Sequence, residues 1–248
     1  MSDRPYELAV VGAGATGSEL AWRVAETGRR VLLVTTSLDT IFAAASERPR
    51  ADAREGTLQH ELRDRLTVRD DGTVGAWELH AAAKGWLETV PSLTVLQSSV
   101  DALVVDGDGA VRGLDTWEGV PRRADRVALC VGSFLRARLL RGASEEHAGR
   151  PGEMAYDELA DDLRARGVPL RPCRWNGPAD EGAPDENRWT VHFERLDRAG
   201  LDGFAVRTVH GLYAAGVCRH GPLTYPGAAR DGADLAHLVL DQMRLGEP

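Results

Sequence analysis

The chain has 248 residues and a formal net charge of −8, with 30 Lys and Arg against 38 Asp and Glu. Nucleic-acid binding depends on clustered positive charge, so this balance argues mildly against a broad nucleic-acid surface. The three cysteines form no CxxC pair, which argues against a disulfide framework and a structural zinc site. The sequence has no signal-peptide pattern and no apolar run of about 18 residues. We therefore expect a cytoplasmic protein without a membrane span.

The first forty residues have the pattern of a βαβ unit. An apolar run at 6–11 leads into Gly12, a helical pattern follows at 13–27, and Gly28 ends it. The continuous apolar run at 31–34 is typical of a strand buried on both faces of a sheet. Beyond a loop at 43–56, we expect helices at 58–66 and 75–90, and strands at 93–96, 100–105, 111–117 and 126–131.

The second half of the chain is less regular. We expect a polar loop at 142–153, a helix at 154–166 and a mobile loop at 176–188, which is rich in Pro, Gly and acidic residues. Alternating hydrophobicity predicts a strand at 189–196, with 204–209 as its pairing partner. A strand at 212–215 and a helix at 227–243 follow. We expect one domain over 1–248, with a smaller inserted segment at about 134–206.

The loop after the first strand is the most informative motif. It reads Gly12, Ala13, Gly14, Ala15, Thr16 and Gly17, which is G-x-G-x-x-G. Between a strand and a helix, this pattern indicates a dinucleotide site. Gly12 permits the tight turn, Gly14 lets a pyrophosphate approach the backbone, and Gly17 lets helix and strand pack closely. The helix N-terminus offers free N–H groups to the phosphates. A glycine-rich turn without a ligand is the alternative interpretation.

The end of the second strand does not fit a plain NAD site. The acidic residue that binds the ribose about 20 residues after the glycine loop is missing. Thr35 and Thr36 stand there instead and can offer hydroxyl groups. Glu19, early in the first helix, is either a substitute for that acid or a solvated residue of the first helical turn.

Two later strand ends favour FAD over NAD. One strand closes on Gly132 and Ser133, and another closes on Gly216 just before the last helix. In flavoproteins with two dinucleotide folds, such ends return to the cofactor, and the last helix directs its N-terminus at the isoalloxazine. Ordinary core strands are the alternative. The predicted FAD contacts are Gly12, Ala13, Gly14, Ala15, Thr16, Gly17, Thr35, Thr36, Val100, Gly132, Ser133, Gly216, Gly227, Ala228 and Ala229. The expected fold class is α/β, a Rossmann-like FAD/NAD(P)-binding domain of this flavoprotein type, with a small β-rich insertion.

Four segments, at 10–19, 32–41, 130–136 and 212–232, resemble in order the FAD domain of the GidA/MnmG flavoenzymes, which modify the wobble uridine of certain tRNAs. The resemblance implies FAD as cofactor. Three departures stand out. Ser46 occupies the position of a reactive family cysteine, and a hydroxyl cannot replace a thiolate nucleophile there. Neither Cys173 nor Cys218 falls on the second cysteine motif of the family, and we expect no helical tRNA-contacting C-terminal domain. The sequence is thus identified as a short GidA-related one.

Catalytic residues are only weakly indicated. Cys218 follows Gly216 and could lie near the flavin, or simply fill space in the core. His220 and Tyr225 flank the expected flavin face, and His220 could donate a proton because its pKa is ordinarily near neutrality. A loop histidine without a role is the alternative. Arg136 and Arg138 could bind an anionic substrate or lie on the surface without a role. The histidines show no metal-ligand spacing.

Three functions stay open from the sequence. The first is an FAD-dependent oxidoreductase with an unidentified substrate, reduced by NAD(P)H or by a partner protein. The second is an accessory flavoprotein of tRNA modification that works with separate proteins, without direct tRNA binding of its own. The third is a flavin-binding module without turnover. A protein partner or a homodimer is compatible with each of them.

Overall fold

The computed structural model describes residues 4–43, 49–51, 53–177 and 189–246. Ser46 and the part of the expected mobile loop at 178–188 lie outside the described residues. Within the described parts, no helix is long and apolar enough to cross a membrane.

A seven-stranded sheet forms the centre of the molecule, in the order β14-β15-β16-β7-β1-β2-β3. Its parallel strands are β1 (Leu8–Val11), β2 (Val31–Thr35), β3 (Leu93–Gln97), β7 (Val127–Leu129) and β16 (Leu212–Ala214). Two short antiparallel strands, β14 (Leu201–Asp202) and β15 (Ala205–Val206), extend one edge. The apolar runs of β1 and β2 are buried along their whole length, as strands covered on both faces must be.

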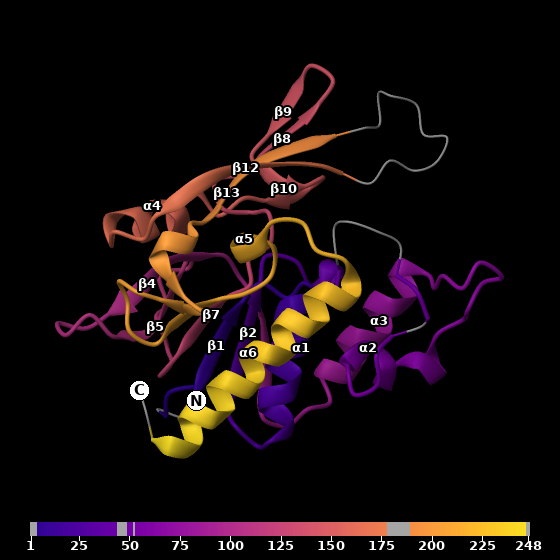
Figure 1. The fold of residues 1–248 in the computed structure, drawn as a ribbon, viewed down its shortest axis with the longest axis horizontal. Coiled ribbons are helices and arrows are strands. Elements are labelled where there is room, and N and C mark those ends of the chain that lie inside the picture. The colour runs from indigo at the N-terminus through magenta and orange to yellow at the C-terminus, as the bar shows by residue number, and fades with distance from the viewer. Residues whose placement is uncertain (1–3, 44–48, 52, 178–188, 247–248) are drawn as a thin grey trace.

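Successive side chains of β1 point into different layers of the core because side chains alternate along a strand. Leu8 and Val10 pack in the cluster that contains the helices α1 (Ala15–Glu26), α3 (Ala76–Leu87) and α6 (Tyr225–Leu245). Ala9 and Val11 pack in the cluster on the opposite face. Figure 1 shows α6 running in front of the sheet beside α1, with α3 and the short α2 (Leu58–Glu61) to one side.

A second layer covers the opposite face of the sheet. It contains a three-stranded antiparallel sheet of β4 (Val100–Val105), β5 (Val111–Thr116) and β6 (Arg122–Arg123). The helix α4 (Asp157–Ala165) packs on β4, where the Asp162 carboxylate accepts a hydrogen bond of 3.0 Å from the Leu103 N–H. Val100 and Leu103 contribute buried side chains to this layer.

A further sheet lies above the carboxyl ends of the parallel strands (Figure 1). Its order is β12-β13-β8-β9, formed by Leu170–Asn176, Thr190–Leu196, Arg138–Arg141 and Ser144–Glu146. A short pair, β10 (Ala148–Arg150) with β11 (Glu153–Met154), and the short helix α5 (Val217–His220) lie near it. Together these elements form the upper wall of the cleft described below.

Most predicted elements are present within one or two residues at each end, but three predictions are wrong. The range 142–153 is not a polar loop, because it contains β9 and β10. The range 204–209 does not pair with 189–196, because β15 pairs with β14 and β16 in the central sheet. The range 58–66 is only the short α2 followed by a 3-10 turn at Arg63–Arg65. Further 3-10 turns lie at Leu38–Thr40 and Arg198–Gly200.

The sequence also failed to predict β12, and its composition explains why. Four of its seven residues are exposed and one is Pro172, so it lacks the apolar alternation that identifies a strand.

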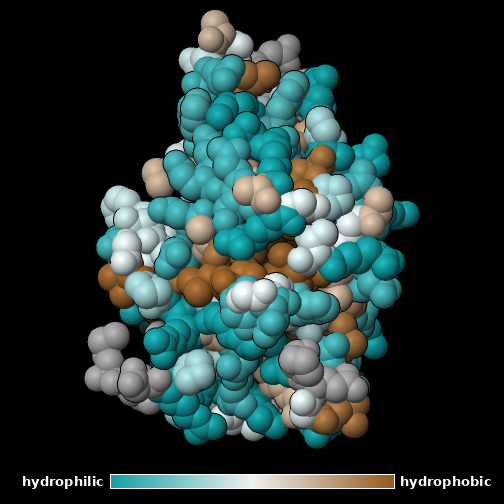
Figure 2. Space-filling model, turned by 90° about the vertical axis from the view of Figure 1, so that its left-hand side faces the viewer, coloured by the Kyte–Doolittle hydropathy of each residue, from teal (hydrophilic) through white to brown (hydrophobic). Residues whose placement is uncertain are grey.

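The surface in Figure 2 is hydrophilic over most of the face it shows, with an apolar band across the middle.

Glycine at position 232 allows α6 to cross α1 at close range, and this predicts a large stability effect. A Cβ atom at Gly232 would lie 2.4 Å from the Thr16 carbonyl oxygen. We expect Gly232→Ala to lower the free energy of unfolding by about 2 kcal/mol or more, because two helix backbones must separate. The control is Gly85→Ala in α3, where nothing lies within 4 Å. There we expect a gain of about 0.5–1 kcal/mol. Urea unfolding of both variants measures the difference, and equal effects would contradict the close-crossing explanation.

Candidate cofactor-binding cleft

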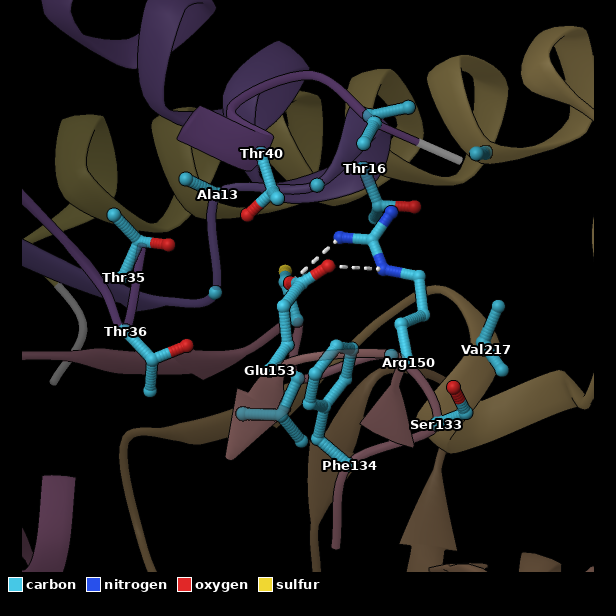
Figure 3. Close-up of a pocket in the computed structure, with 18 of the residues that line it drawn as sticks. Ala13, Thr16, Thr35, Thr36, Thr40, Ser133, Phe134, Arg150, Glu153 and Val217 are labelled. Carbon is cyan, nitrogen blue, oxygen red and sulfur yellow. Dashed lines mark hydrogen bonds and ion pairs between the residues drawn. The ribbon is translucent and has the colours of Figure 1, made fainter. Parts of the chain in front are cut away.

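A cleft lies at the carboxyl ends of β1, β2 and β7, and Figure 3 shows residues that line it, with the glycine-loop wall drawn at the top and the wall that holds Arg150 at the bottom, the reverse of Figure 1. It has a volume of about 800 Å³, counting the part open to solvent. The lower wall is the glycine loop and the start of α1, and the upper wall includes Arg150, Glu153 and Trp175.

The glycine loop is shaped by close backbone contacts. Gly12 has φ +97°, and a Cβ atom there would lie 2.4 Å from the Cys130 carbonyl oxygen at the end of β7. A Cβ atom at Gly17 would lie 1.9 Å from the Gly12 carbonyl oxygen. Gly12 therefore permits the turn, and Gly17 allows α1 to start directly against the loop. Gly14 lines the cleft and precedes the first residue of α1.

The N-terminus of α1 opens into the cleft. Ala13, Ala15 and Thr16 all line it, and among the described residues no side chain caps the helix at Gly14. The Ala15 N–H donates to the Ala43 carbonyl oxygen at 3.2 Å. Among the described residues, the N–H groups of Thr16 and Gly17 have no hydrogen-bond acceptor. These free donors and the positive end of the helix dipole make the first turn suited to an anion.

Thr35 ends β2 and Thr36 follows it, and both line the cleft, as a ribose site at this strand end requires. The Thr35 hydroxyl donates to the Ser37 carbonyl oxygen at 3.0 Å. The Thr36 hydroxyl contacts Tyr156, which comes from the other wall of the cleft. Burial raises the pKa of Tyr156 well above its ordinary value, so its phenol stays neutral.

The structure contradicts both interpretations of Glu19 drawn from the sequence, the ribose-binding acid and the solvated residue. Its side chain is fully buried, so it is no solvated acid, and it does not line the cleft. One carboxylate oxygen accepts the Leu58 N–H at 2.8 Å, at the start of α2, and the other lies 2.6 Å from Arg23 Nε. Burial raises the pKa of Glu19, although these two partners oppose the rise. Its role is structural, because it connects α1 to α2.

The other end of the cleft is lined mainly by apolar groups. Gly132 and Ser133 line it after β7, and Trp175 reaches it from β12. Val217 from α5 and Ala228 from the first turn of α6 complete this end, together with Pro222 and Leu223. The first turn of α6 is capped, because the Thr224 hydroxyl accepts the Gly227 N–H at 3.2 Å.

Ten of the predicted FAD contacts line the cleft. They are Gly12, Ala13, Gly14, Ala15, Thr16, Thr35, Thr36, Gly132, Ser133 and Ala228. The others, Gly17, Val100, Gly216, Gly227 and Ala229, are not among its lining residues. Val100 is buried in the layer behind the central sheet. Contact of any of these residues with a cofactor stays a prediction.

The three catalytic candidates do not line the cleft. Cys218 is fully buried and its thiol contacts the carbonyl oxygens of Leu129 at 3.3 Å and Ala215 at 3.2 Å. Burial raises the pKa of the Cys218 thiol to about 12, so it is not a thiolate near neutral pH. Tyr225 is buried at the start of α6, with its ring centroid 6.3 Å from that of Phe42. The space-filling interpretation of Cys218 fits this placement.

His220 is held by an acid that the sequence did not indicate. Its Nε2 lies 3.0 Å from Asp231 Oδ1. The same oxygen is 3.1 Å from an Arg219 nitrogen, and Asp231 Oδ2 accepts the Gly216 N–H at 2.5 Å. This cluster fixes α5 against α6. The structure therefore gives His220 a partner outside the cleft.

The two arginines considered for an anionic substrate are engaged elsewhere. Arg138 makes a bidentate pair with Asp157, at 3.0 and 3.1 Å, and Arg136 pairs with Asp161. Neither lines the cleft. Within the described part of the chain, no three His, Cys, Asp or Glu side chains gather as a metal site would require.

The charged residues of the cleft were missed by the sequence analysis. Arg150 and Glu153 are the only charged side chains among the described residues that line it. They lie in β10 and β11, inside the range expected to be a polar loop. A cluster of Gly, Pro and charged residues at 149–153 gives no periodic signal, so nothing in the local pattern distinguished these side chains from solvated ones.

The sheet order, the glycine loop and the cleft above it define a Rossmann-like α/β protein of the FAD/NAD(P)-binding flavoprotein type. The family model described as "Glucose inhibited division protein A" matches residues 7–67 and 74–173. The chain belongs to this family, abbreviated GIDA.

Relatives with known sequences agree with this assignment. The chain is 32% identical over 76% of its length to a tRNA uridine 5-carboxymethylaminomethyl modification enzyme MnmG of Chlamydia muridarum, and covers 37% of that protein. It is 30% identical over 83% of its length to the enzyme of the same name from Syntrophobacter fumaroxidans, and covers 33% of it. The chain thus spans about a third of the length of these relatives.

Two solved structures share the fold. The GidA-related protein from Thermus thermophilus is 31% identical, with a TM-score of 0.83 and coverage of 96% of this chain and 100% of that chain. GidA from Aquifex aeolicus is 15% identical, with a TM-score of 0.81 and coverage of 98% of this chain and 64% of that chain. At 15% identity the second comparison shows the fold alone.

The burial of two cysteines predicts their chemical behaviour. Cys130 and Cys218 are buried, and burial raises the pKa of both thiols. Cys173 is half-buried. At pH 8 in native buffer we expect iodoacetamide to label Cys173 first, and the other two only after denaturation, because the thiolate is the reacting species. Peptide mass spectrometry of the alkylated protein gives the order. Rapid labelling of Cys218 in native buffer would contradict this prediction and show that its thiol is reactive.

Proposed function

We propose that the cleft binds FAD and that the protein is an FAD-dependent oxidoreductase. One observation carries the proposal. Figure 3 shows Thr35 and Thr36 at one end of the cleft, Ala13 and Thr16 along its middle, and Val217 at the other end. That order matches the adenosine, pyrophosphate and isoalloxazine of an extended FAD.

The lining residues fit this cofactor. Gly14 lines the cleft, and among the described residues beyond its chain neighbours an added Cβ would come within 4 Å of the Ala43 carbonyl oxygen alone, at 3.1 Å. The free N–H groups of Thr16 and Gly17 provide donors for the pyrophosphate. Thr36 offers a hydroxyl group at the ribose position. The match to GIDA-family proteins supports the same ligand.

The protein residues at the apolar end would orient the ring and exclude water from one side of it. FAD, when bound, supplies transfer of a hydride or of single electrons. Among the described lining residues at this end, none is a His, Lys, Asp or Glu that could pass a proton to a substrate. The reductant, NAD(P)H or a partner protein, and the substrate stay predictions.

Flavin binding can be tested directly. We expect the purified protein, incubated with FAD and desalted, to retain close to one FAD per chain, measured by absorbance and by chromatography of the released chromophore. Gly14→Ala should weaken FAD binding roughly tenfold or more, because the methyl group stands between the backbone and the pyrophosphate. The control is again Gly85→Ala, in an exposed position of α3. Parent protein that takes up no FAD would refute the proposed cofactor.

Turnover needs a separate measurement. We expect anaerobic NADH or NADPH to bleach the flavin absorbance of the FAD-loaded protein, followed by reoxidation when air is admitted. Stopped-flow absorbance gives both rates. If neither nucleotide reduces the flavin while dithionite does, then NAD(P)H is not the reductant, and a partner-reduced protein or a flavin-binding module without turnover becomes the better description.

A second candidate function comes from the relatives. The MnmG proteins named above are tRNA-modifying enzymes, so an accessory role of this chain in tRNA modification is the alternative, with a separate protein contacting the tRNA. The net charge of −8 disfavours direct tRNA binding. A gel-shift titration with bulk tRNA at low salt decides this point, since retardation at micromolar protein would contradict the expected lack of direct binding.

A further inference from the structure

Among the arginines that the structure describes, Arg150 is the one that lines the candidate cofactor-binding cleft. It lies at the end of β10, in the upper wall, and Figure 3 shows its side chain extending toward the glycine loop and Thr16. Its side chain is only 16% exposed and that of Glu153 only 12%. Two charged side chains buried to this degree in a cleft wall need an electrostatic explanation.

Glu153 engages one side of the guanidinium group. Arg150 Nε lies 2.9 Å from Glu153 Oε1, and the second terminal nitrogen donates to Oε2 at 3.0 Å. Among the described residues, the other terminal nitrogen has no hydrogen-bond acceptor. A guanidinium group has five N–H donors in a fixed plane. Several donors therefore remain for a ligand in the cleft.

The loop after β7 holds Arg150 in this position. The Phe134 ring lies 5.6 Å from the guanidinium carbon and covers it. The Ser133 hydroxyl donates to the Gly149 carbonyl oxygen at 3.2 Å. A Cβ atom at Gly149 would lie 2.4 Å from the Phe134 ring, so glycine there allows the ring to pack beside Arg150. Glu153 and Phe134 thus hold the guanidinium group itself, and the Ser133–Gly149 hydrogen bond holds the backbone next to it.

The charges in the cleft indicate which group of a ligand Arg150 can bind. The pyrophosphate of FAD carries two negative charges, and Arg150 is the only cation among the described residues that line the cleft. Arginine binds phosphate oxygens through two parallel N–H donors. Glu153, in contrast, places a carboxylate in the same region and repels a dianion.

Resting on the proposed function, we infer that Arg150 binds the FAD pyrophosphate from the side opposite the glycine loop, and that Glu153 shares this arginine and thereby limits the affinity. The pyrophosphate is then held between backbone N–H groups of the lower wall and a guanidinium group of the upper wall. Arg150 is the binding residue, and Glu153 is a positioning residue that acts through it.

The two residues predict opposite effects on FAD binding. Arg150→Gln removes the charged hydrogen bonds and should raise the FAD dissociation constant roughly ten- to a hundredfold. Glu153→Gln removes a like charge and should lower it roughly twofold or more. A purely structural ion pair predicts that both variants bind FAD more weakly, because each leaves a buried charge without its partner. Fluorescence titration of the flavin-free proteins measures the constants.

A double variant tests the role of Arg150 without the unpaired buried charge that could misfold either single variant. Arg150→Gln with Glu153→Gln leaves no unpaired buried charge, and we expect it to bind FAD at least roughly tenfold more weakly than the parent. Its control is Arg244→Gln with Asp241→Asn, an exposed pair in the last turns of α6, which should leave the constant unchanged. The affinity of the parent should also fall with salt more steeply than that of the double variant.

The outcomes separate the two proposals. If the parent takes up no FAD, the proposed function fails. If the parent binds FAD and the double variant binds it within twofold, FAD binding stands and the role of Arg150 is refuted. If Glu153→Gln binds FAD as weakly as Arg150→Gln, or with the affinity of the parent, then the sharing of Arg150 between Glu153 and the pyrophosphate is refuted.

Discussion

The architecture depends on the close approach of backbones around the first turn of α1. Gly12 and Gly17 bring the loop against β7 and against itself. From the other direction, a Cβ atom at Gly216 would lie 2.8 Å from the Thr16 hydroxyl, and one at Gly232 would lie 2.4 Å from the Thr16 carbonyl oxygen. Segments from opposite ends of the chain therefore meet at Thr16. The loop at Gly12, the backbone at Gly216 and α6 at Gly232 all pack closely against this turn. The cleft lies on the side of the turn that they leave uncovered, where its N–H groups are free.

The two walls of the cleft contribute different chemistry. The lower wall offers backbone donors and threonine hydroxyls, which are neutral and fixed by the glycine contacts. The upper wall offers side chains, among them Arg150, Glu153 and Trp175, held by the loop after β7 and by β12. A ligand that needs both neutral donors and a cation must contact both walls. The position of the upper sheet over the strand ends therefore matters as much as the glycine loop itself.

The sequence predicted the lower wall well and the upper wall poorly, for a physical reason. Around Gly12 and the strand at 31–34, local periodicity, glycine geometry and burial all point to the same structure. In the upper wall, β9 and β12 are short or exposed, and their pairing is set by partners distant in the chain. Glu19 shows the same limit in a single residue. Its position suggested solvent or a ribose, whereas the Leu58 N–H, 39 residues away, determines its actual role.

The meeting of α1 and α6 has a consequence for how the protein is made. The ribosome synthesises the glycine loop long before Gly216 and Gly232, the residues that close on it. Parallel pairing of β1 with β7 also joins Ala9 to Val127, far along the chain. Such long-range contacts form slowly and leave apolar strands exposed until they do. The nascent chain must therefore keep β1 and β2 from aggregating until β7 has been synthesised, and a cofactor can find a complete site only after α6 has left the ribosome.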